Sequence, residues 1–323
     1  MDNHERLRVS TVRMKLPAPE RRIRASLPLI RFMQSYVPLP MARWLIEQGL
    51  ARTRLSAAVF REAVMADDVP CVWVIPQECL PDRALLYLHG GGFVLGLTPQ
   101  HLKMGAYLAQ KLGVRVLMVE YRLAPDHPFP AALDDCTTAY RWLLKQGFLA
   151  ENLAVAGDSA GGNLTLTTLL KLRDQGDRLP AAAACLSPVT DLATTDHQRP
   201  GFKDPLLPAK AMKRYSQSYL GRHDAHDPMI SPVYGDLRGL PPLLVHAGED
   251  EILREDAVRM VSLAQSAGVD ARLEIYPRMW HVWQINLSLP QAVQSLDTIA
   301  QFFQGHLELT TRQSRVKPLA ARR

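Results

Sequence analysis

The amino-acid sequence predicts an α/β fold with a mostly parallel, doubly wound sheet flanked by helices. Short apolar runs that suit buried strands alternate with longer segments of helical periodicity along most of the chain. The residues with reactive side chains fall just after the ends of these runs, where ligands bind in such sheets. A chain of 323 residues, 47% of them hydrophobic and 22% charged, can also bury the core of one large domain.

Two helices are expected before the sheet begins. Apolar residues recur at helical spacing over residues 22–36, and a second helical run follows at 41–50, with Trp44 among its apolar anchors. Prolines separate the two runs. Because both runs precede the first expected strand, we expect them to lie over the sheet, and we assign residues 1–50 to N-terminal cap helices.

The sheet is expected to start with a hairpin. Strand patterns at residues 57–64 and 71–75 flank Asp67-Asp68, a pair that favours a turn. Residues 51–187 and 236–310 are assigned to the α/β core. Within it, strands are expected at 84–88, 114–119, 153–156, 181–186, 243–246 and 271–276, and helices at 100–112, 131–146, 162–172, 254–267 and 291–306.

One segment interrupts this alternation. No clean strand lies between Ser187 and Leu240, where prolines and glycines surround a single helical run at residues 209–220. A long insertion of this kind in a compact domain is usually functional and often forms a lid. We assign residues 188–235 to a cap insertion, and residues 311–323 to a basic C-terminal tail that we expect to be disordered.

The composition excludes several classes of protein. The longest apolar runs are far shorter than a membrane span, so no integral membrane association is expected. Residues 1–15 mix charges without a secretory apolar core, and the four cysteines have neither metal-ligand nor CxxC spacing. We therefore expect a cytoplasmic protein with reduced thiols, and no metal or other cofactor.

The net charge of +6 is the compositional feature that suggests a macromolecular partner. Arginines and lysines gather near both ends of the chain, and such a patch could bind nucleic acid or lipid headgroups. A solvated terminus and a frayed tail explain the same residues with fewer assumptions. We therefore expect a small molecule as the main partner and no nucleic acid, and we leave a homodimer open.

A candidate reactive centre lies at the motif Gly157-Asp158-Ser159-Ala160-Gly161. The motif separates an apolar strand run from a helical run, so that Ser159 stands at the apex of a strand–turn–helix unit. Small residues on both sides of the serine allow a tight turn and leave its Oγ accessible, as in a nucleophile elbow. The same five-residue pattern also occurs in ordinary turns, and the rest of the chain decides in favour of the elbow.

A glycine-rich loop follows an earlier strand. His89 precedes three glycines, Gly90 to Gly92, whose backbone N–H groups no side chain obstructs. In enzymes with a nucleophile elbow, such a loop supplies part of the oxyanion hole. The alternative is a phosphate-binding loop, but no Gly-Lys-Ser/Thr ending follows, and Phe93 begins an apolar run that suits an acyl pocket better.

A serine nucleophile needs a base, and the base needs an acid that orients it. An acidic segment, residues 247–253, follows one late strand, and His281 follows the last strand. In isolation, His281 would be interpreted as a core histidine packed beside two tryptophans. Its place after the last strand favours the role of base instead, and the order serine, acid, histidine is that of α/β-hydrolases.

Taken together, these motifs resemble the hormone-sensitive-lipase-like family (family IV) of bacterial carboxylesterases, in the α/β-hydrolase superfamily. The resemblance implies an α/β-hydrolase fold with a helical cap, with Ser159 and His281 as catalytic residues. It also implies that Gly91, Gly92 and Ala160 donate the N–H groups of the oxyanion hole. The motifs that carry it are His89-Gly90-Gly91-Gly92-Phe93, Tyr121-Arg122-Leu123-Ala124-Pro125 with His127-Pro128-Phe129-Pro130-Ala131, Gly157-Asp158-Ser159-Ala160-Gly161-Gly162-Asn163, and Asp227-Pro228 with Ile230-Ser231-Pro232.

The triad acid departs from the family pattern. The family commonly has Asp-Pro-Leu there, whereas this chain has Asp250-Glu251-Ile252-Leu253. Matching by identity favours Asp250, whereas keeping the acid-x-Leu spacing favours Glu251. We prefer Glu251 and leave Asp250 as the alternative.

The substrate pocket is expected to be apolar and to lie beneath the cap. The family's usual His-Gly-Phe is His281-Val282-Trp283 here, so that two tryptophans add bulk beside the base. The residues predicted to line the pocket are Phe93, Trp44, Leu207, Tyr215, Trp280 and Trp283.

The sequence thus predicts a serine carboxylesterase that hydrolyses short- to medium-chain carboxylic esters through an acyl-enzyme intermediate. The segment around His281 also resembles members that are lactone hydrolases or acetylhydrolases, which is the alternative function. A non-catalytic receptor of the same fold, similar to plant gibberellin receptors, is disfavoured because those typically lack the histidine. Amide hydrolysis uses the same chemistry, and only the analogy of fold disfavours it.

Overall fold

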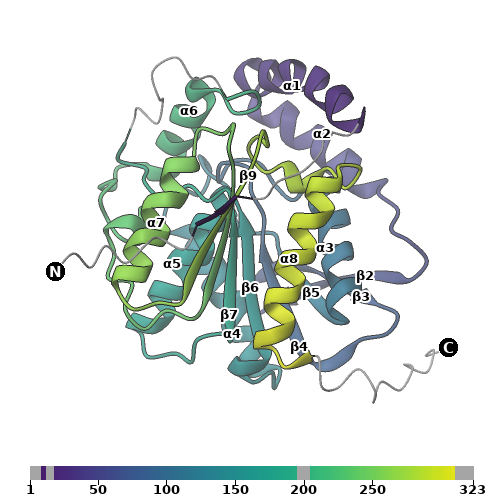
Figure 1. The fold of residues 1–323 in the computed structure, drawn as a ribbon, viewed down its shortest axis with the longest axis vertical. Helices are drawn as coiled ribbons and strands as arrows, with labels where there is room; N and C mark the ends of the chain where they lie inside the picture. The colour runs from purple at the N-terminus through teal and green to yellow at the C-terminus, as the bar shows by residue number, and fades with distance from the viewer. Residues whose placement is uncertain (1–8, 12–17, 195–203, 310–323) are drawn as a thin grey trace.

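The computed structural model describes residues 9–11, 18–194 and 204–309 (Figure 1). The basic tail expected at 311–323 lies outside the described residues. The strands are β1 (Val9–Thr11), β2 (Val59–Ala66), β3 (Val69–Pro76), β4 (Leu80–Leu88), β5 (Val114–Val119), β6 (Leu153–Asp158), β7 (Ala182–Leu186), β8 (Leu243–Gly248) and β9 (Ala271–Tyr276). The helices are α1 (Ala18–Tyr36), α2 (Leu39–Ala51), α3 (Pro99–Leu112), α4 (Ala131–Lys145), α5 (Ala160–Asp174), α6 (Ala209–Leu220), α7 (Arg254–Ser266) and α8 (Pro290–His306), with short 3₁₀ turns η1 (Ala150–Asn152), η2 (Pro232–Tyr234) and η3 (Trp283–Ile285).

All the described strands belong to one sheet. Their order is β1-β9-β8-β7-β6-β4-β5-β3-β2, and all run parallel except β3, which is antiparallel to both of its neighbours. The expected hairpin is the pair β2–β3, with Asp67 in a left-handed conformation (φ 54°) at its turn. The mostly parallel, doubly wound sheet predicted from the sequence is therefore confirmed.

The strand β1 is not predicted by the sequence pattern, and the expectation that no strand precedes the first two helices is wrong. β1 pairs in parallel with β9, with Val9 opposite Leu273. A strand of three residues at the edge of a sheet is held by backbone hydrogen bonds on one side only. It is too short to show the alternation by which strands are recognised.

Helices cover both faces of the sheet. On one face α3 and α8 pack against Leu85 and Tyr87, and on the other face α4 and α5 pack against Leu86 and Leu88. Successive residues of a strand point to opposite faces, so β4 is apolar on both sides because both sides are covered. The central strand β6 is buried along its whole length for the same reason.

Helices α1, α2 and α6 lie together at one end of the sheet, at the top of Figure 1. Arg214 and Tyr215 of α6 both donate hydrogen bonds to the backbone carbonyl of Gln34 on α1, at 2.9 and 3.2 Å. Residues of α1 and α6 line the cavity over Ser159, which follows β6. The two helices therefore lie over the carboxyl ends of the strands, where a parallel sheet binds its ligands.

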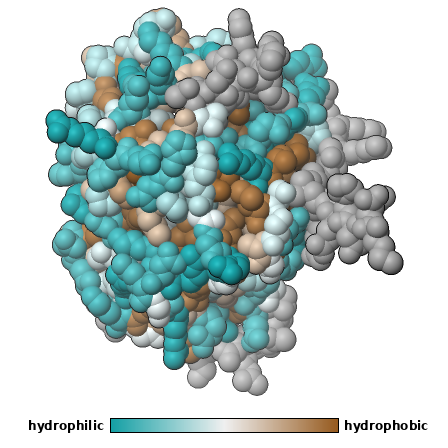
Figure 2. Space-filling view, turned by 90° about the vertical axis from the view of Figure 1, so that its left-hand side faces the viewer, coloured by the Kyte–Doolittle hydropathy of each residue, from teal (hydrophilic) through white to brown (hydrophobic). Residues whose placement is uncertain are grey.

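The described surface is largely hydrophilic. Figure 2 shows the side that carries α6 and α7, where hydrophilic residues cover most of the surface. In the part of the chain that the structure describes, no helix is both long and apolar enough to cross a bilayer. Nor do the described residues include a group of three or more His, Cys, Asp or Glu placed to hold a metal ion. The four cysteines are free and buried.

Candidate active site

Ser159 lies in a sharp turn between β6 and α5. Its backbone has φ 53° and ψ −116°, a conformation that residues other than glycine rarely adopt. The turn is closely packed, since a Cβ on Gly161 would lie 1.9 Å from the carbonyl O of Leu88, and one on Gly157 would lie 2.2 Å from the carbonyl O of Gly161. Only glycine fits at these two positions, and the tight turn presents the serine at the end of the sheet.

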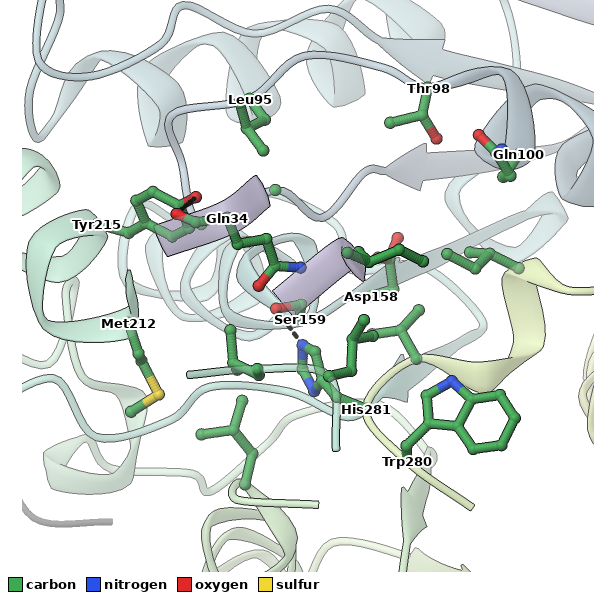
Figure 3. A pocket seen from close by; sticks show the side chains of 18 of the residues that line it. Gln34, Leu95, Thr98, Gln100, Asp158, Ser159, Met212, Tyr215, Trp280 and His281 are labelled. Atoms are coloured by element: carbon green, nitrogen blue, oxygen red, sulfur yellow. Dashed lines mark hydrogen bonds between the residues drawn. The ribbon is translucent and has the colours of Figure 1, made fainter. Parts of the chain in front are cut away.

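His281 lies beside the serine, in the loop that follows β9. Its Nε2 is 2.9 Å from Ser159 Oγ, the dashed contact in Figure 3. This is the distance of a hydrogen bond in which the serine hydroxyl can donate to a neutral imidazole. The fold therefore brings a candidate base to the candidate nucleophile across 122 positions of sequence.

Glu251, rather than Asp250, is the acid that lies beside the histidine. Glu251 Oε2 is 3.4 Å from His281 Nδ1, and the Glu251 side chain is fully buried. Asp250 instead pairs with Arg24 of α1 at 2.9 Å, and its side chain is 36% exposed. Successive side chains leave the backbone of this loop in different directions, so only one of the two acids faces the imidazole.

Burial and pairing have opposite effects on the histidine. Burial by itself would lower the pKa of His281, but its interaction with Glu251 raises the pKa above the ordinary value. Burial raises the pKa of the Glu251 carboxyl, and the neighbouring imidazole acts against that rise. Glu251 thus stabilises a positive charge on the buried His281. A histidine that acts as a base needs this stabilisation, because it becomes charged when it accepts a proton.

The glycine-rich loop after β4 lies against the same cavity. Gly91 and Gly92 have φ angles of 126° and 62°, and a Cβ on Gly92 would lie 2.5 Å from the ring of Tyr215. The backbone can therefore approach a ligand closely at this loop. Ala160 is the first residue of α5, and the first N–H groups of a helix have no partner inside that helix.

A buried network that sequence reasoning missed connects the elbow to the glycine-rich loop. Asp158 Oδ1 accepts hydrogen bonds from the Tyr87 hydroxyl at 2.7 Å and from Gly90 N–H at 3.0 Å. His101 Nε2 lies 3.2 Å from Asp158 Oδ2, and the other ring nitrogen of His101 contacts Thr98. Burial would raise the pKa of Asp158, but His101, with the other donors, lowers it. The single signal in the sequence was the place of Asp158 inside the elbow motif.

The loops that carry the acid and the base are tied to each other and to the segment before α6. Asp250 N–H donates to the carbonyl O of Met279 at 2.9 Å. Ile252 N–H donates to Asp204 Oδ2 at 2.8 Å. The backbone on both sides of Glu251 is therefore held in place, which limits movement of the acid away from the imidazole.

A cavity of about 330 Å³ opens over the serine (Figure 3). Four of the predicted pocket residues line it: Phe93, Leu207, Tyr215 and Trp280. Gln34 of α1 also lines it, and its side chain points toward Ser159 in Figure 3. The wall combines residues of the α/β core with residues of α1 and α6, so the two parts of the chain share one cavity.

Two predicted pocket residues do not line the cavity. Trp44 lies on α2, a helix without a buried residue, and is 56% exposed. Trp283 is fully buried away from the cavity, where its ring packs 4.9 Å from that of Tyr276 and its Nε1 donates to the carbonyl O of Gln291 at 3.3 Å. Both predictions were wrong because sequence position alone does not indicate which side of a helix or turn an aromatic ring occupies.

Val282, the residue after the histidine, has an unusual backbone. Its φ of 48° and ψ of 47° lie in the left-handed region, which is unfavourable for a β-branched side chain. The family that this sequence resembles usually has glycine at this position. Such a backbone conformation costs about 1–3 kcal/mol. Val282 lines the cavity, and its apolar side chain narrows the space beside the base.

The chain is similar in sequence and in fold to known hydrolases. The family model described as an alpha/beta hydrolase fold matches residues 85–285. The acetyl-hydrolase of Streptomyces hygroscopicus is 40% identical over 233 residues, 71% of this chain and 78% of that protein. The ethyl acetate hydrolase of Pseudomonas putida is 34% identical over 246 residues, 72% of this chain and 76% of that protein. A crystal structure of an esterase from the bacterial hormone-sensitive lipase family superposes with a TM-score of 0.83 at 37% identity, over 91% of this chain and 100% of that one.

Proposed function

Since the chain belongs to the α/β-hydrolase family, in the branch that resembles hormone-sensitive lipase, we propose that it is a serine carboxylesterase acting on short- to medium-chain esters. The observation that carries the proposal is the contact of 2.9 Å between Ser159 Oγ and His281 Nε2, with Glu251 on the far side of the imidazole. A strained turn presents the serine, as a nucleophile elbow requires.

The proposed reaction has two halves. Ser159 attacks the ester carbonyl while His281 accepts the serine proton, and the same imidazole then protonates the departing alcohol. The N–H groups of Gly91, Gly92 and Ala160 stabilise the charge that develops on the carbonyl oxygen. Water then attacks the acyl-enzyme with His281 as base, and Glu251 stabilises the imidazolium in both halves. The chemistry needs no cofactor.

The size of the cavity supports a preference for short acyl chains. Its volume of about 330 Å³ is close to the lower end of ligand pockets, which span roughly 300–1,000 Å³. Each added methylene contributes about 0.8 kcal/mol only while apolar wall remains to contact it. We expect kcat/KM to rise from acetate to about butyrate or hexanoate and then to fall. The names of the two hydrolase relatives, which refer to acetyl and ethyl acetate substrates, agree with the short end of this range.

Residues 1–50 and 188–235 are proposed to act as the cap that sets this limit. Support comes from Leu27 of α1 and Met212 of α6, which line the cavity together with residues of the core. A series of p-nitrophenyl esters from acetate to palmitate would measure the limit, with Ser159→Ala as the inactive reference. Efficient hydrolysis of emulsified long-chain triglycerides would contradict the proposed limit without contradicting the serine mechanism.

Acetylhydrolase or lactone hydrolase activity is the second candidate. The identity to an acetyl-hydrolase over 71% of the chain favours it, and the triad would act in the same way. Parallel assays with acetyl esters, lactones and linear esters would rank the three classes. A non-catalytic receptor stays a remote alternative, which a burst of p-nitrophenol from p-nitrophenyl butyrate would eliminate. Cytoplasmic location and a homodimer stay predictions.

A further inference from the structure

Helices α1 and α2 carry an unusual number of exposed apolar side chains. Of thirteen exposed large hydrophobic residues in the described chain, eight lie on these two helices. We call this set the cap-helix patch: Leu29, Ile30, Phe32, Met33, Tyr36, Met41, Trp44 and Leu45. Leu29 and Tyr36 are 63% and 62% exposed, as surface polar residues usually are. Exposed apolar side chains gathered on two successive helices, as here, are typical of an interaction site for a protein or a membrane.

The charge of the three helices at this end of the molecule is strongly positive. α1, α2 and α6 together contain eight arginines and lysines against two acids, a net charge of +6. The whole chain has 38 basic and 32 acidic residues, so the remainder, with 30 of each, is balanced. Asp250 and Asp126, outside these helices, pair with Arg24 and Arg43, and counting these two acids leaves the group with a net charge of +4.

The basic and apolar groups lie side by side. Arg21 and Arg22 are exposed on α1, and the Nζ of Lys210 on α6 lies 5.4 Å from the centre of the Tyr36 ring. Surface helices that bind lipid combine an apolar side with arginine and lysine in this way. Ile30 belongs to the patch and also lines the cavity, so the patch reaches the mouth of the candidate active site.

We infer that the cap-helix patch docks this protein peripherally on an anionic phospholipid bilayer. Apolar side chains would enter the boundary between headgroups and acyl chains, while the surrounding cations pair with lipid phosphates. A second copy of the chain fits less well, because two surfaces of the same charge would repel each other. The inference does not depend on the esterase function, since it concerns binding alone.

The exposed Trp44 supplies a direct probe. Among the five tryptophans, three are buried and Trp142 is half-buried, so a change of emission on docking would come from Trp44. The full chain would be titrated with vesicles of phosphatidylglycerol and phosphatidylcholine, and separately with pure phosphatidylcholine. We expect co-sedimentation and a blue shift with the anionic vesicles only, both weakened by salt. In Trp44→Phe the shift should vanish while sedimentation persists.

Matched variants locate the binding surface. Phe32→Glu should lower the partition coefficient at least tenfold, whereas Leu149→Glu should leave it unchanged, although Leu149, before β6, is an apolar residue of similar exposure (51% against 58%). Each of Lys210→Gln and Lys213→Gln should lower it about fivefold, and Lys145→Gln on α4 should not. The melting temperature and the far-UV circular dichroism spectrum of each variant serve as the check of folding.

Three outcomes would overturn the inference. The first is absence of binding to anionic vesicles. The second is binding that Phe32→Glu does not weaken but that glutamines in place of Arg312 and Arg315 abolish, which would assign lipid binding to the basic tail. The third is a dimer in solution that Phe32→Glu dissociates, which would assign the patch to a second copy of the chain.

Discussion

Two helices of similar length show how differently the two parts of the molecule are held. α5, which begins at the elbow, has 15 residues, of which 12 are buried, whereas α2 has 13 residues and none is buried. Arg43 of α2 donates hydrogen bonds to the carbonyl oxygens of Val94 and Ala124 in the core, at 2.9 and 2.6 Å, and the partly buried Leu39 and Leu50 pack against the core. Few buried contacts mean a low free energy of local opening.

This difference in packing distinguishes the residues that carry out the reaction from those that select the substrate. The reactive geometry rests on a fully packed core, where glycines and buried hydrogen bonds leave little freedom. Helix α2, in contrast, has no buried residue, so its exposed side chains can change at little cost to folding. Substitutions near the elbow should therefore affect rate or folding, whereas substitutions of exposed residues on α2 should affect neither.

The largest effect is expected at the elbow itself. Ser159→Ala should lower kcat by about 10⁶-fold, because the nucleophile is lost while the packing around it is kept. Initial rates with p-nitrophenyl butyrate and the melting temperature of the same sample test both parts. Turnover at the wild-type rate in the purified variant would end the proposal of a serine esterase.

The next effect compares two neighbouring acids. Glu251→Gln should lower kcat by roughly 10⁴-fold, as in the comparable change of a protease triad, because an amide cannot stabilise the imidazolium. Asp250→Asn should cost far less, since Asp250 faces Arg24 on α1. If Asp250→Asn were instead the inactive variant, the 3.4 Å contact of Glu251 would not be the catalytic one.

Two tryptophans, one in the packed core and one on α2, allow the stabilities of the two regions to be compared. Trp280→Ala should lower the free energy of unfolding by about 3–5 kcal/mol, because the side chain is fully buried. Trp44→Ala, at an exposed position, should stay within about 0.5 kcal/mol. Urea denaturation of both variants measures the difference. Equal losses would mean that α2 is packed far more firmly than its exposure indicates.

The pH dependence tests the electrostatics of the packed region. His281 must be neutral to accept the serine proton, and its pKa is raised above the ordinary 6.5. The acid limb of kcat/KM should therefore have its midpoint above 6.5, with a fall of about tenfold per pH unit below it. The residual activity of Glu251→Gln should show this limb at lower pH, while Asp250→Asn should leave it in place. If the midpoint of the acid limb were the same in Glu251→Gln as in the wild type, the pairing of Glu251 with His281 would be contradicted.

The smallest effect concerns the cavity wall. Val282→Gly should raise kcat/KM for the hexanoate ester relative to the butyrate ester, by about fourfold for each methylene that gains new apolar contact. Glycine also adopts the left-handed backbone at this position without strain. The ratio of kcat/KM for the two esters measures the effect, with Val293→Gly on α8, outside the cavity, as the control. An unchanged ratio would show that Val282 does not limit the acyl chain.

Local sequence patterns predicted most of the sheet and its helices, because apolar runs and turn residues act over short distances. They also predicted the elbow, since Gly157 and Gly161 are needed by the backbone of Ser159 itself. What they missed depends on distant partners. His101 lies 57 positions before Asp158, and neither residue carries a local sign of the contact.

The short strand β1 has a consequence for how the chain can be shortened. It pairs with β9 at one edge of the sheet, whereas β2, which follows the outer helices, forms the opposite edge. β1 and β2, which precede and follow the two N-terminal helices, therefore lie at opposite edges of the sheet. A truncation that begins at α1 would leave the backbone of β9 without a partner on the side away from β8, and an exposed edge strand can pair with a strand of another chain. Such a truncated protein should aggregate even though every residue of the active site is present.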